Sequence, residues 1–204
     1  MTRPAIALIR SVLGKHAWQI RWDHQVGLRL DFGLPWLHIR EPRRVKTKHA
    51  RVRELFARRL VALRGSHYLW IAPEAWRIVA RNNLLVRRAS SAKACDRACN
   101  QLSGEALIGV SIEPATGNTV FRFDLGGRLE ATAPRGWGTD SNDDELWSLS
   151  GPRERFVGIY AGGYHAVGRT TRPDPKPTRL ATRGTINIQL SHTAAPSAVP
   201  LTCA

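Results

Sequence analysis

The most constraining feature of this chain is a repeat. The stretch LRLDFG at residues 28–33 returns as FRFDLG at residues 121–126. The match extends outward, so that residues 14–42 align with 104–134, and a second block that starts at Leu69-Trp70 aligns with one at Leu146-Trp147. Two copies of about 75 residues with one order of elements indicate an internal duplication. Each copy is therefore expected to fold in the same way.

Each copy has the alternation of a β-strand. Leu28, Leu30 and Phe32 point to one side of a strand, and Arg29 and Asp31 point to the other, because successive side chains alternate faces. The second copy repeats the apolar set at Phe121, Phe123 and Leu125 and the polar set at Arg122 and Asp124. Turns are expected at Gly33, Gly126-Gly127, Asn82-Asn83 and Gly162-Gly163, since Gly and Asn tolerate left-handed backbone conformations. The sequence predicts a mainly β (α+β) fold of two duplicated antiparallel β repeats.

The copies differ by an insertion in the first. Val52, Leu55, Phe56, Leu60 and Leu63 recur at helical spacing, and a glycine follows at position 65. This pattern predicts one inserted basic amphipathic helix at residues 46–64. From 43 to 64 the segment has nine Lys or Arg and a single acid. The acidic loop GWGTDSNDDEL is expected to occupy the same place in the second copy.

These elements divide the chain into four parts. Residues 1–91 are expected to form the first β repeat, 92–101 a linker helix, and 102–171 the second β repeat. Residues 172–204 are expected to form a proline-rich tail that is mostly disordered, in which GTINIQL at 184–190 is a candidate edge strand.

The net charge of +15 is unevenly distributed. Residues 1–101 contain 21 Lys and Arg and 6 Asp and Glu, whereas residues 102–204 contain 10 of each. A general compositional bias would affect both halves alike. The basic surface of the first half is therefore the main functional clue.

The duplicated Asp residues suggest one catalytic hypothesis. Asp31 and Asp124 are each followed two residues later by Gly, and aspartic proteases join two such loops as a carboxylate pair. Those loops have Thr or Ser at the middle position, where this chain has Phe32 and Leu125. We expect exposed Arg29/Asp31 and Arg122/Asp124 pairs instead, each contributing at most about 1 kcal/mol.

Metal and cofactor motifs are also missing from the sequence. Cys95 and Cys99 are expected to be small packing residues, since no partner motif stands nearby. Asp140, Asn142 and Asp144 resemble part of a calcium loop, but the central Gly and the distant Glu are missing, so a solvated loop is favoured. The seven histidines form no metal or triad spacing. We expect no enzyme, no metal and no cofactor.

Cysteine use and hydropathy indicate the compartment. Three cysteines give no disulfide framework, and the N-terminal apolar run stops at Arg10 without a cleavage site. No stretch approaches the roughly 20 apolar residues of a membrane-spanning helix. A cytoplasmic protein without a membrane partner is expected. Trp36 and Trp137 lie next to turns and are the best candidates for exposed aromatic contacts.

The turn and Trp positions of the second copy carry a resemblance. The motifs are F-x-L-G-G-x-L from position 123, E-L-W-S-L-S-G-P from 145 and A-G-G-Y-H-A-V from 161. In these motifs the chain resembles uncharacterised bacterial two-repeat β proteins that are loosely immunity-protein-like and are commonly associated with immunity proteins of polymorphic toxin systems. The resemblance implies a non-enzymatic, partner-binding role and supplies no catalytic residues.

Three hypotheses follow for the basic segment. The first is an immunity-like protein that masks an acidic protein surface, such as that of a toxin. The second is a nucleic-acid binder that uses the same patch on phosphates. The third is a helix that only covers a sheet, with solvated charges. For the first two hypotheses the predicted partner-binding residues are Arg43, Arg44, Lys46, Lys48, Arg51, Arg58 and Trp36.

Overall fold

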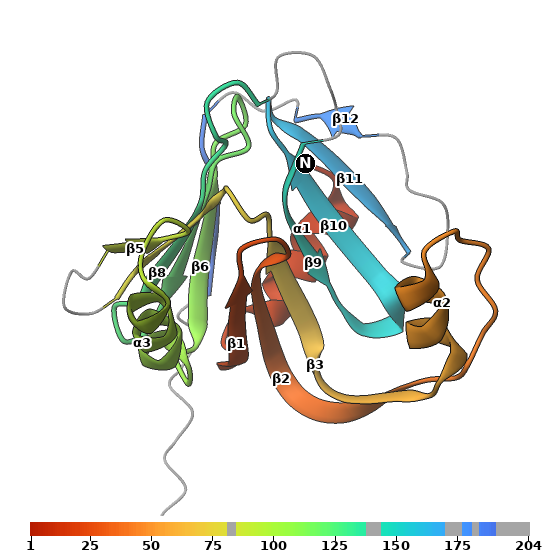
Figure 1. Ribbon diagram of the computed structural model, residues 1–204. Coiled ribbons are helices and arrows are strands. Elements are labelled where there is room, and N and C mark those ends of the chain that lie inside the picture. Colours follow the sequence, from red (N-terminus) through yellow and green to blue (C-terminus); the bar gives the residue numbers. More distant parts are fainter. Residues whose placement is uncertain (81–84, 138–143, 170–176, 181–183, 191–204) are drawn as a thin grey trace, which may run out of the picture.

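The computed structural model describes residues 1–80, 85–137, 144–169, 177–180 and 184–190. In this part the chain is mainly β, with two antiparallel sheets and three α-helices, as the sequence predicted (Figure 1). The helices are α1 (Arg3–Val12), α2 (Ala50–Ala57) and α3 (Ala92–Leu102). None of the helices in these ranges is long and apolar enough to cross a bilayer.

The two sheets are built from interleaved parts of the chain. In the seven-stranded sheet the order is β1 (Ala17–Asp23), β2 (Gly27–Arg40), β3 (Leu60–Ile71), β9 (Glu145–Ser150), β10 (Arg155–Tyr160), β11 (Tyr164–Arg169) and β12 (Thr178–Arg179). In the six-stranded sheet it is β13 (Ile186–Gln189), β6 (Leu107–Ile112), β7 (Thr119–Phe123), β8 (Arg128–Ala131), β4 (Trp76–Val79) and β5 (Leu85–Arg87).

This order shows how the two repeats combine. Strands β1-β2-β3 of the first half are followed by β9-β10 of the second, and β6-β7-β8 of the second half are followed by β4-β5 of the first. The halves have therefore exchanged their last strands. One hydrophobic core cluster contains residues of both halves, including the fully buried Trp76 and Trp147.

Hydrogen bonds at the junction of the halves have twofold symmetry. Gly14 N donates to Leu107 O over 2.7 Å, and Gly104 N donates to Ala17 O over 2.8 Å. Leu107 N donates to Lys15 O, and Ala17 N donates to Glu105 O. Gly14 and Gly104 have φ of +79° and +90°, a conformation that favours glycine at both equivalent positions.

The helices α1 and α3 occupy equivalent places in the two repeats. Ala5, Leu8, Ile9 and Val12 are the buried residues of α1, and the same spacing recurs in α3 as Cys95, Ala98, Cys99 and Leu102. The expected helix at 92–101 is thus present and acts as the first helix of the second repeat. Helix α1 was not among the elements predicted from the sequence. The two described cysteines are free and pack where α1 has Ala5 and Ile9, and burial raises the pKa of Cys99 to about 12.

Three of the four expected turns can be compared with the structure. Gly162 and Gly163, with φ of +74° and +77°, form the turn between β10 and β11, as predicted. Gly126 lies in the turn between β7 and β8. Gly33 does not end its strand, because β2 continues through an irregularity between Phe32 and Pro35 to residue 40. The Asn82-Asn83 pair lies outside the described residues.

The predicted helix at 46–64 is wrong in its bounds. Only Ala50–Ala57 is helical, and residues 60–64 belong to β3, where they pair with 36–40 of β2. No residue of α2 is buried, so no packing favours extending the helix. Pairing with β2 satisfies the backbone of residues 60–64 instead.

The alignment of the second block also needs correction. The Leu69-Trp70 pair lies in β3, whereas Leu146-Trp147 lies in β9, and the strand equivalent to β9 is β4. The inserted segment joins β2 to β3, where the second repeat has the turn between β7 and β8. The acidic loop instead joins β8 to β9, so the two segments do not share one place in the fold.

The described parts of the tail are strands. Ile186–Gln189 pairs with β6 as β13 at the edge of its sheet, which confirms the candidate edge strand. Residues Thr178–Arg179 form β12 beside β11. The remaining residues of the tail lie outside the described ranges.

Candidate functional site: a basic and apolar β arm

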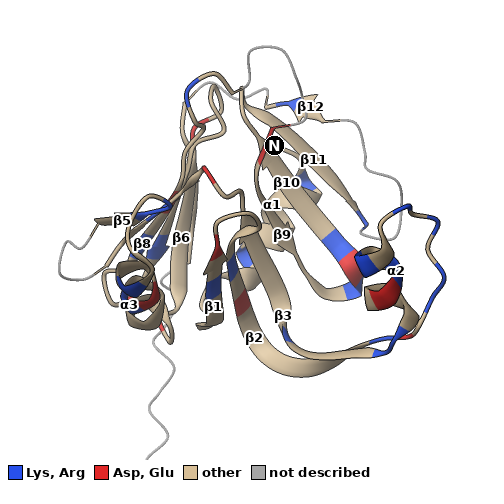
Figure 2. Ribbon diagram, viewed as in Figure 1, with Lys and Arg blue, Asp and Glu red and all other residues tan. Residues whose placement is uncertain are grey.

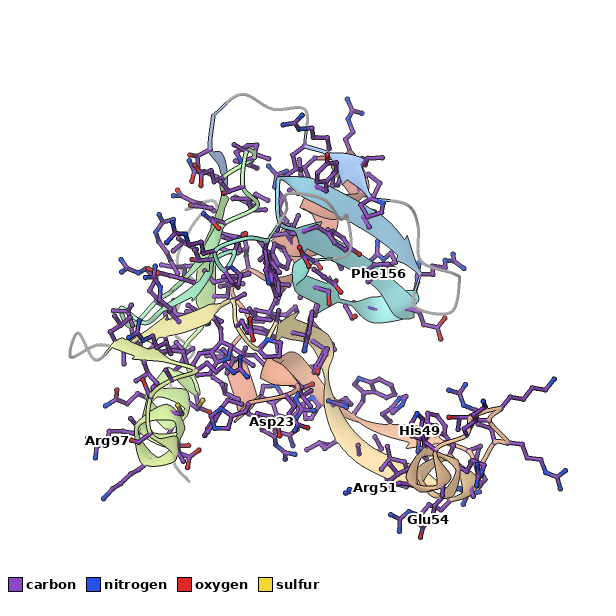
Figure 3. All side chains as sticks on the ribbon, turned by 45° about the horizontal axis from the view of Figure 1, so that its top comes forward. Asp23, His49, Arg51, Glu54, Arg97 and Phe156 are labelled. Atoms are coloured by element: carbon purple, nitrogen blue, oxygen red, sulfur yellow. The ribbon has the colours of Figure 1, made fainter. Side chains whose placement is uncertain are left out.

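Residues 34–64 form a projection that we call the arm. It consists of the second part of β2, a segment that contains α2, and the first part of β3 (Figure 1). Figure 3 shows α2, with His49, Arg51 and Glu54 labelled, at the far end of this projection and away from the two sheets. The ladder is regular, since position 36 faces 64 and position 40 faces 60.

One face of the arm is apolar. Because Leu37 faces Leu63 and Ile39 faces Val61 in the ladder, these four side chains share a face. Their exposed fractions are 61%, 43%, 53% and 54% in that order. In β3 the same face continues into His67 and Leu69, which are buried in the rest of the protein, here called the body. The arm thus extends the inner face of the sheet beyond the core, and we call these four residues the apolar strip.

The arm is also strongly basic. From 34 to 64 it contains ten Lys and Arg and two acids, Glu41 and Glu54. Figure 2 shows the blue segments along α2 and the loop before it. Arg59 pairs with Glu41 over 2.9 Å, and both side chains are exposed, so screening leaves this pair little effect on stability.

The structure brings the predicted partner-binding residues together on the arm. Trp36 is 50% exposed and lies at the base of the arm, where its Nε1 donates to Gly65 O over 2.9 Å. The others lie in or beside the segment that contains α2, and all are exposed: Arg43, Arg44, Lys46, Lys48, Arg51 and Arg58.

Two arginines hold the tip of the arm, which is the segment 41–59 between β2 and β3, in place. The guanidinium carbons of Arg40 and Arg43 lie 4.2 Å and 4.7 Å from the centre of the Phe56 ring. Arg43 N donates to Phe56 O over 2.8 Å, and Arg40 Nη2 donates to Leu55 O over 2.6 Å. Arg43 therefore supports α2 in addition to adding charge.

A groove that the sequence analysis missed lies at the base of the arm. Its volume is about 650 Å³, within the range of binding pockets. One wall has Trp36, Arg64 and Tyr68, with the Arg64 guanidinium 5.1 Å from the centre of the Tyr68 ring. The other wall is residues 150–154 between β9 and β10. Only the pairing of β3 with β9 brings these walls together, so no local pattern could reveal them.

The second wall of the groove includes an unusual backbone. Arg153 and Glu154 both have φ of +60°, which is uncommon for residues with a Cβ. Such conformations cost on the order of 1–3 kcal/mol and cluster at functional sites. This second observation supports the groove as part of the site.

Asp31 anchors the arm and is not a surface residue. It is 2% exposed, and its Oδ1 accepts a hydrogen bond from Gly65 N over 2.7 Å. Burial raises the pKa of Asp31, opposed by that hydrogen bond and by nearby arginines. The expected exposed pair Arg29/Asp31 is therefore wrong, because Asp31 is buried and its Oδ1 is bonded to the backbone of β3.

Asp124 has a different structural role. It is exposed, and its Oδ1 accepts a hydrogen bond over 2.8 Å from the N–H of Ala106, the residue before β6. Each Asp thus accepts a hydrogen bond from a backbone amide, Asp31 from Gly65 N and Asp124 from Ala106 N. Leu125, which was expected on the buried face, is 52% exposed because it lies in the turn after β7.

His67 forms a buried contact with α1. Its Nε2 lies 2.9 Å from Ser11 Oγ and its Nδ1 lies 3.1 Å from Ser66 Oγ, so both ring nitrogens already have hydroxyl partners. Burial, with Lys15 and Arg155 nearby, lowers the pKa of His67 from 6.5 to about 4. His67 is therefore neutral in the folded protein at pH 7.

This pKa predicts a loss of stability in mild acid. Between pH 6.5 and pH 4 the unfolded chain binds a proton at His67 that the folded protein does not bind, so the free energy of unfolding falls as the pH is lowered. The full loss is about 3 kcal/mol, and it is complete below pH 4. Urea unfolding at several pH values should show this loss in the wild type and not in His67→Gln. The control is His16→Gln, at an exposed position, which should lose stability in acid as the wild type does. If His16→Gln removed the loss to the same extent as His67→Gln, the assignment of the loss to His67 would be wrong.

The other candidate sites do not form a centre. In the ranges the structure describes, no group of three or more His, Cys, Asp or Glu could hold a metal ion. Asp140 and Asn142 of the suggested calcium loop lie outside those ranges. Trp137 is half-buried and packs against the core, unlike the exposed contact expected for it.

The arm and the groove are thus the two candidate functional features of the part of the chain that the structure describes. They bring exposed apolar, aromatic and cationic groups together at one end of the seven-stranded sheet. No family model, curated protein or solved structure matches the chain.

Proposed function

We propose that the protein is a non-enzymatic partner-binding protein whose arm docks on an acidic surface of another protein. The observation that carries this proposal is the coexistence, on one arm, of the bare apolar strip and ten cationic side chains. An immunity-like role, in which the arm masks a toxin, is the form of this function that the resemblance implies. The free thiols of Cys95 and Cys99 support a cytoplasmic location as part of the same proposal.

The apolar strip favours a protein partner over nucleic acid. A phosphate backbone is recognised by cations and hydrogen-bond donors, and exposed aliphatic side chains add little to it. In a protein interface, burying one such side chain fully contributes about 1.5–3 kcal/mol. Leu37 and Ile39 would remain exposed to water in a purely electrostatic complex.

The charges would set how fast and how selectively the partner binds. Cations around an apolar centre steer an acidic surface and repel basic ones, and they change the association rate more than the affinity. The two parts of the arm thus have different roles, since the apolar strip supplies affinity and the tip supplies selectivity.

Charge reversal at the tip tests the proposal. A variant with Arg44, Lys46, Lys48, Arg51 and Arg58 changed to Glu should bind the partner at least about tenfold more weakly through slower association, because five cations that attract an acidic surface become five anions that repel it. Arg43 is left unchanged because it packs on Phe56. The matched control reverses five exposed charges of the body: Arg3, Arg10, Lys93, Arg97 and Arg135. Partners captured from nuclease-treated extract are identified by mass spectrometry and measured again with purified protein.

The outcomes separate the hypotheses. Loss of an acidic protein partner in the tip variant, with binding kept in the control, supports the proposal. Equal binding by both variants means that the arm is not the site. If nuclease treatment removes all binding and the protein shifts a 30-base-pair DNA or a single-stranded RNA at about 50 mM salt, the nucleic-acid alternative is correct.

A further inference from the structure

The edge of β3 is left open where the arm begins. Along the body β3 has β2 on one side and β9 on the other, and β9 pairs with it from Ile71 to Tyr68. At Ser150, opposite Tyr68, β9 ends and the chain turns away at Gly151. In the described part of the chain, no strand pairs with residues 60–66 of β3 on that side.

An open edge of this kind can accept another strand. In an antiparallel ladder every second residue directs its N–H and C=O to the same side, so only alternate residues from 60 to 66 direct their backbone groups toward the path that β9 leaves. Gly65 is not among them, because its N–H and C=O are bonded to Asp31 Oδ1 and Trp36 Nε1 of β2. Proteins usually protect such edges with proline or inward charges. The outer edge of β2 has Pro35 in this region, whereas β3 has no proline from 60 to 66.

The groove lies in line with this open edge. Its walls are residues of β3 (Arg64, Gly65, Ser66 and Tyr68) and the segment where β9 turns away (residues 150–154). The groove therefore begins where the pairing of β3 with β9 ends, and an extended segment that continued the direction of β9 would enter it.

We propose that an extended acidic segment of the partner protein adds to the open edge of β3 as an antiparallel strand. This inference rests on the proposed function and names the way in which the partner binds. Main-chain hydrogen bonds to residues 60–66 would hold the segment, as in other cases of β-strand addition. The groove at the base of the arm would receive the end of the added strand.

The faces of β3 specify the side chains of that segment. On the inner face the added strand meets Val61 and Leu63 of the apolar strip, and on the outer face it meets Arg64. Because side chains of a strand alternate, the segment should alternate apolar and acidic residues. The basic tip, with Arg58 and Arg59 close to β3, adds to the preference for acids.

A second copy of this chain fits the edge poorly. Pairing two arms through the same edge would bring two segments of ten Lys and Arg together, and like charges at close range oppose association. An acidic partner has the complementary charge.

Synthetic peptides test this mode of binding. The probe is a nine-residue peptide that alternates Val or Leu with Asp or Glu, and its control has the same composition with the acids in one block. Fluorescence anisotropy should show at least about tenfold tighter binding of the alternating peptide. Hydrogen exchange of the backbone amides at residues 60–66 should slow in the complex. Equal affinity of the two peptides, or unchanged exchange at residues 60–66, would overturn the proposal.

N-methylation of the peptide provides a control that does not depend on side chains. Blocking one alternate set of peptide amides should abolish binding, and blocking the other set should leave it, because only one set faces β3. In Arg64→Glu, a peptide with Lys in place of the acids should bind better than the acidic peptide. Equal effects of the two methylated sets would exclude strand addition. If strand addition is excluded in this way but the tip variant still loses its protein partner, the proposed function stands and only the strand-addition mode of binding is rejected.

Discussion

Shortening the arm to a tight turn is expected to abolish partner binding and leave the body folded. In this variant residues 38–62 are replaced by Asn-Gly. The flanking Leu37 and Leu63 face each other in the ladder, which is the geometry that a two-residue hairpin turn requires. The change removes α2 and the basic tip, and we expect affinity for the partner to fall roughly 100-fold or more.

The body should tolerate this change because its core does not include the arm. No residue of α2 is buried, and residues 34–64 contribute nothing to the buried core. The shortened chain keeps the hydrogen bonds from Trp36 Nε1 to Gly65 O and from Gly65 N to Asp31 Oδ1. The free energy of unfolding should therefore stay within about 1 kcal/mol of the wild type in urea titrations. The second repeat already closes the equivalent strands, β7 and β8, with a short turn.

Two results would contradict this expectation. Full partner binding by the shortened protein would place the site elsewhere. A loss of several kcal/mol in stability would mean that the arm belongs to the folding unit. Circular dichroism of the shortened protein separates the two, since loss of binding is informative only if the β spectrum is retained.

Replacing Trp147 with Ala is expected to have the largest effect on stability. Trp147 is fully buried in β9, and its Nε1 donates to Thr119 Oγ1 of β7 over 2.8 Å. Its ring lies edge-to-face with Phe121, with centroids 5.2 Å apart. One side chain thus connects the two sheets. Truncating a buried aromatic residue costs about 3–5 kcal/mol, a large part of the stability of a domain this size.

Smaller changes separate packing from hydrogen bonding at this position. Trp147→Phe keeps a ring but leaves Thr119 Oγ1 without its donor, which costs on the order of 1–3 kcal/mol. Trp36→Ala is the matched control, because Trp36 is half exposed and lies outside the core. In urea titrations the free energy of unfolding should be lower for Trp147→Ala than for Trp147→Phe, and that of Trp36→Ala should be close to the wild-type value. A loss of under 1 kcal/mol in Trp147→Ala would refute the role of Trp147 between the sheets.

The fold class could be predicted because its evidence is local. The alternation of Leu28, Leu30 and Phe32 with polar residues needs no partner strand to be recognised. The repeat motif marked β2 and β7 correctly as equivalent strands. The burial of Asp31 could not be predicted, since it depends on tertiary packing and accompanies a hydrogen bond from Gly65 N in the neighbouring strand β3.

The candidate site was predicted only in part. Arg44, Lys46 and Arg51 were identified from charge alone, and the structure places them on one projection. The groove escaped detection because Arg64 and Arg153 are far apart in the chain and meet only through the exchange of strands between repeats.

The sequence by itself determined the duplication, the β class and the concentration of positive charge in residues 43–64, because composition and periodicity encode these properties residue by residue. Only the tertiary structure decided whether Leu60 and Leu63 belong to a helix or a strand. Their spacing of three residues favours one face of a helix, but long-range pairing with residues 37–40 of β2 selects the strand, in which the two side chains lie on opposite faces. The same pairing turns an expected surface helix into an arm with a bare apolar strip and an open edge, and on these the proposed binding depends.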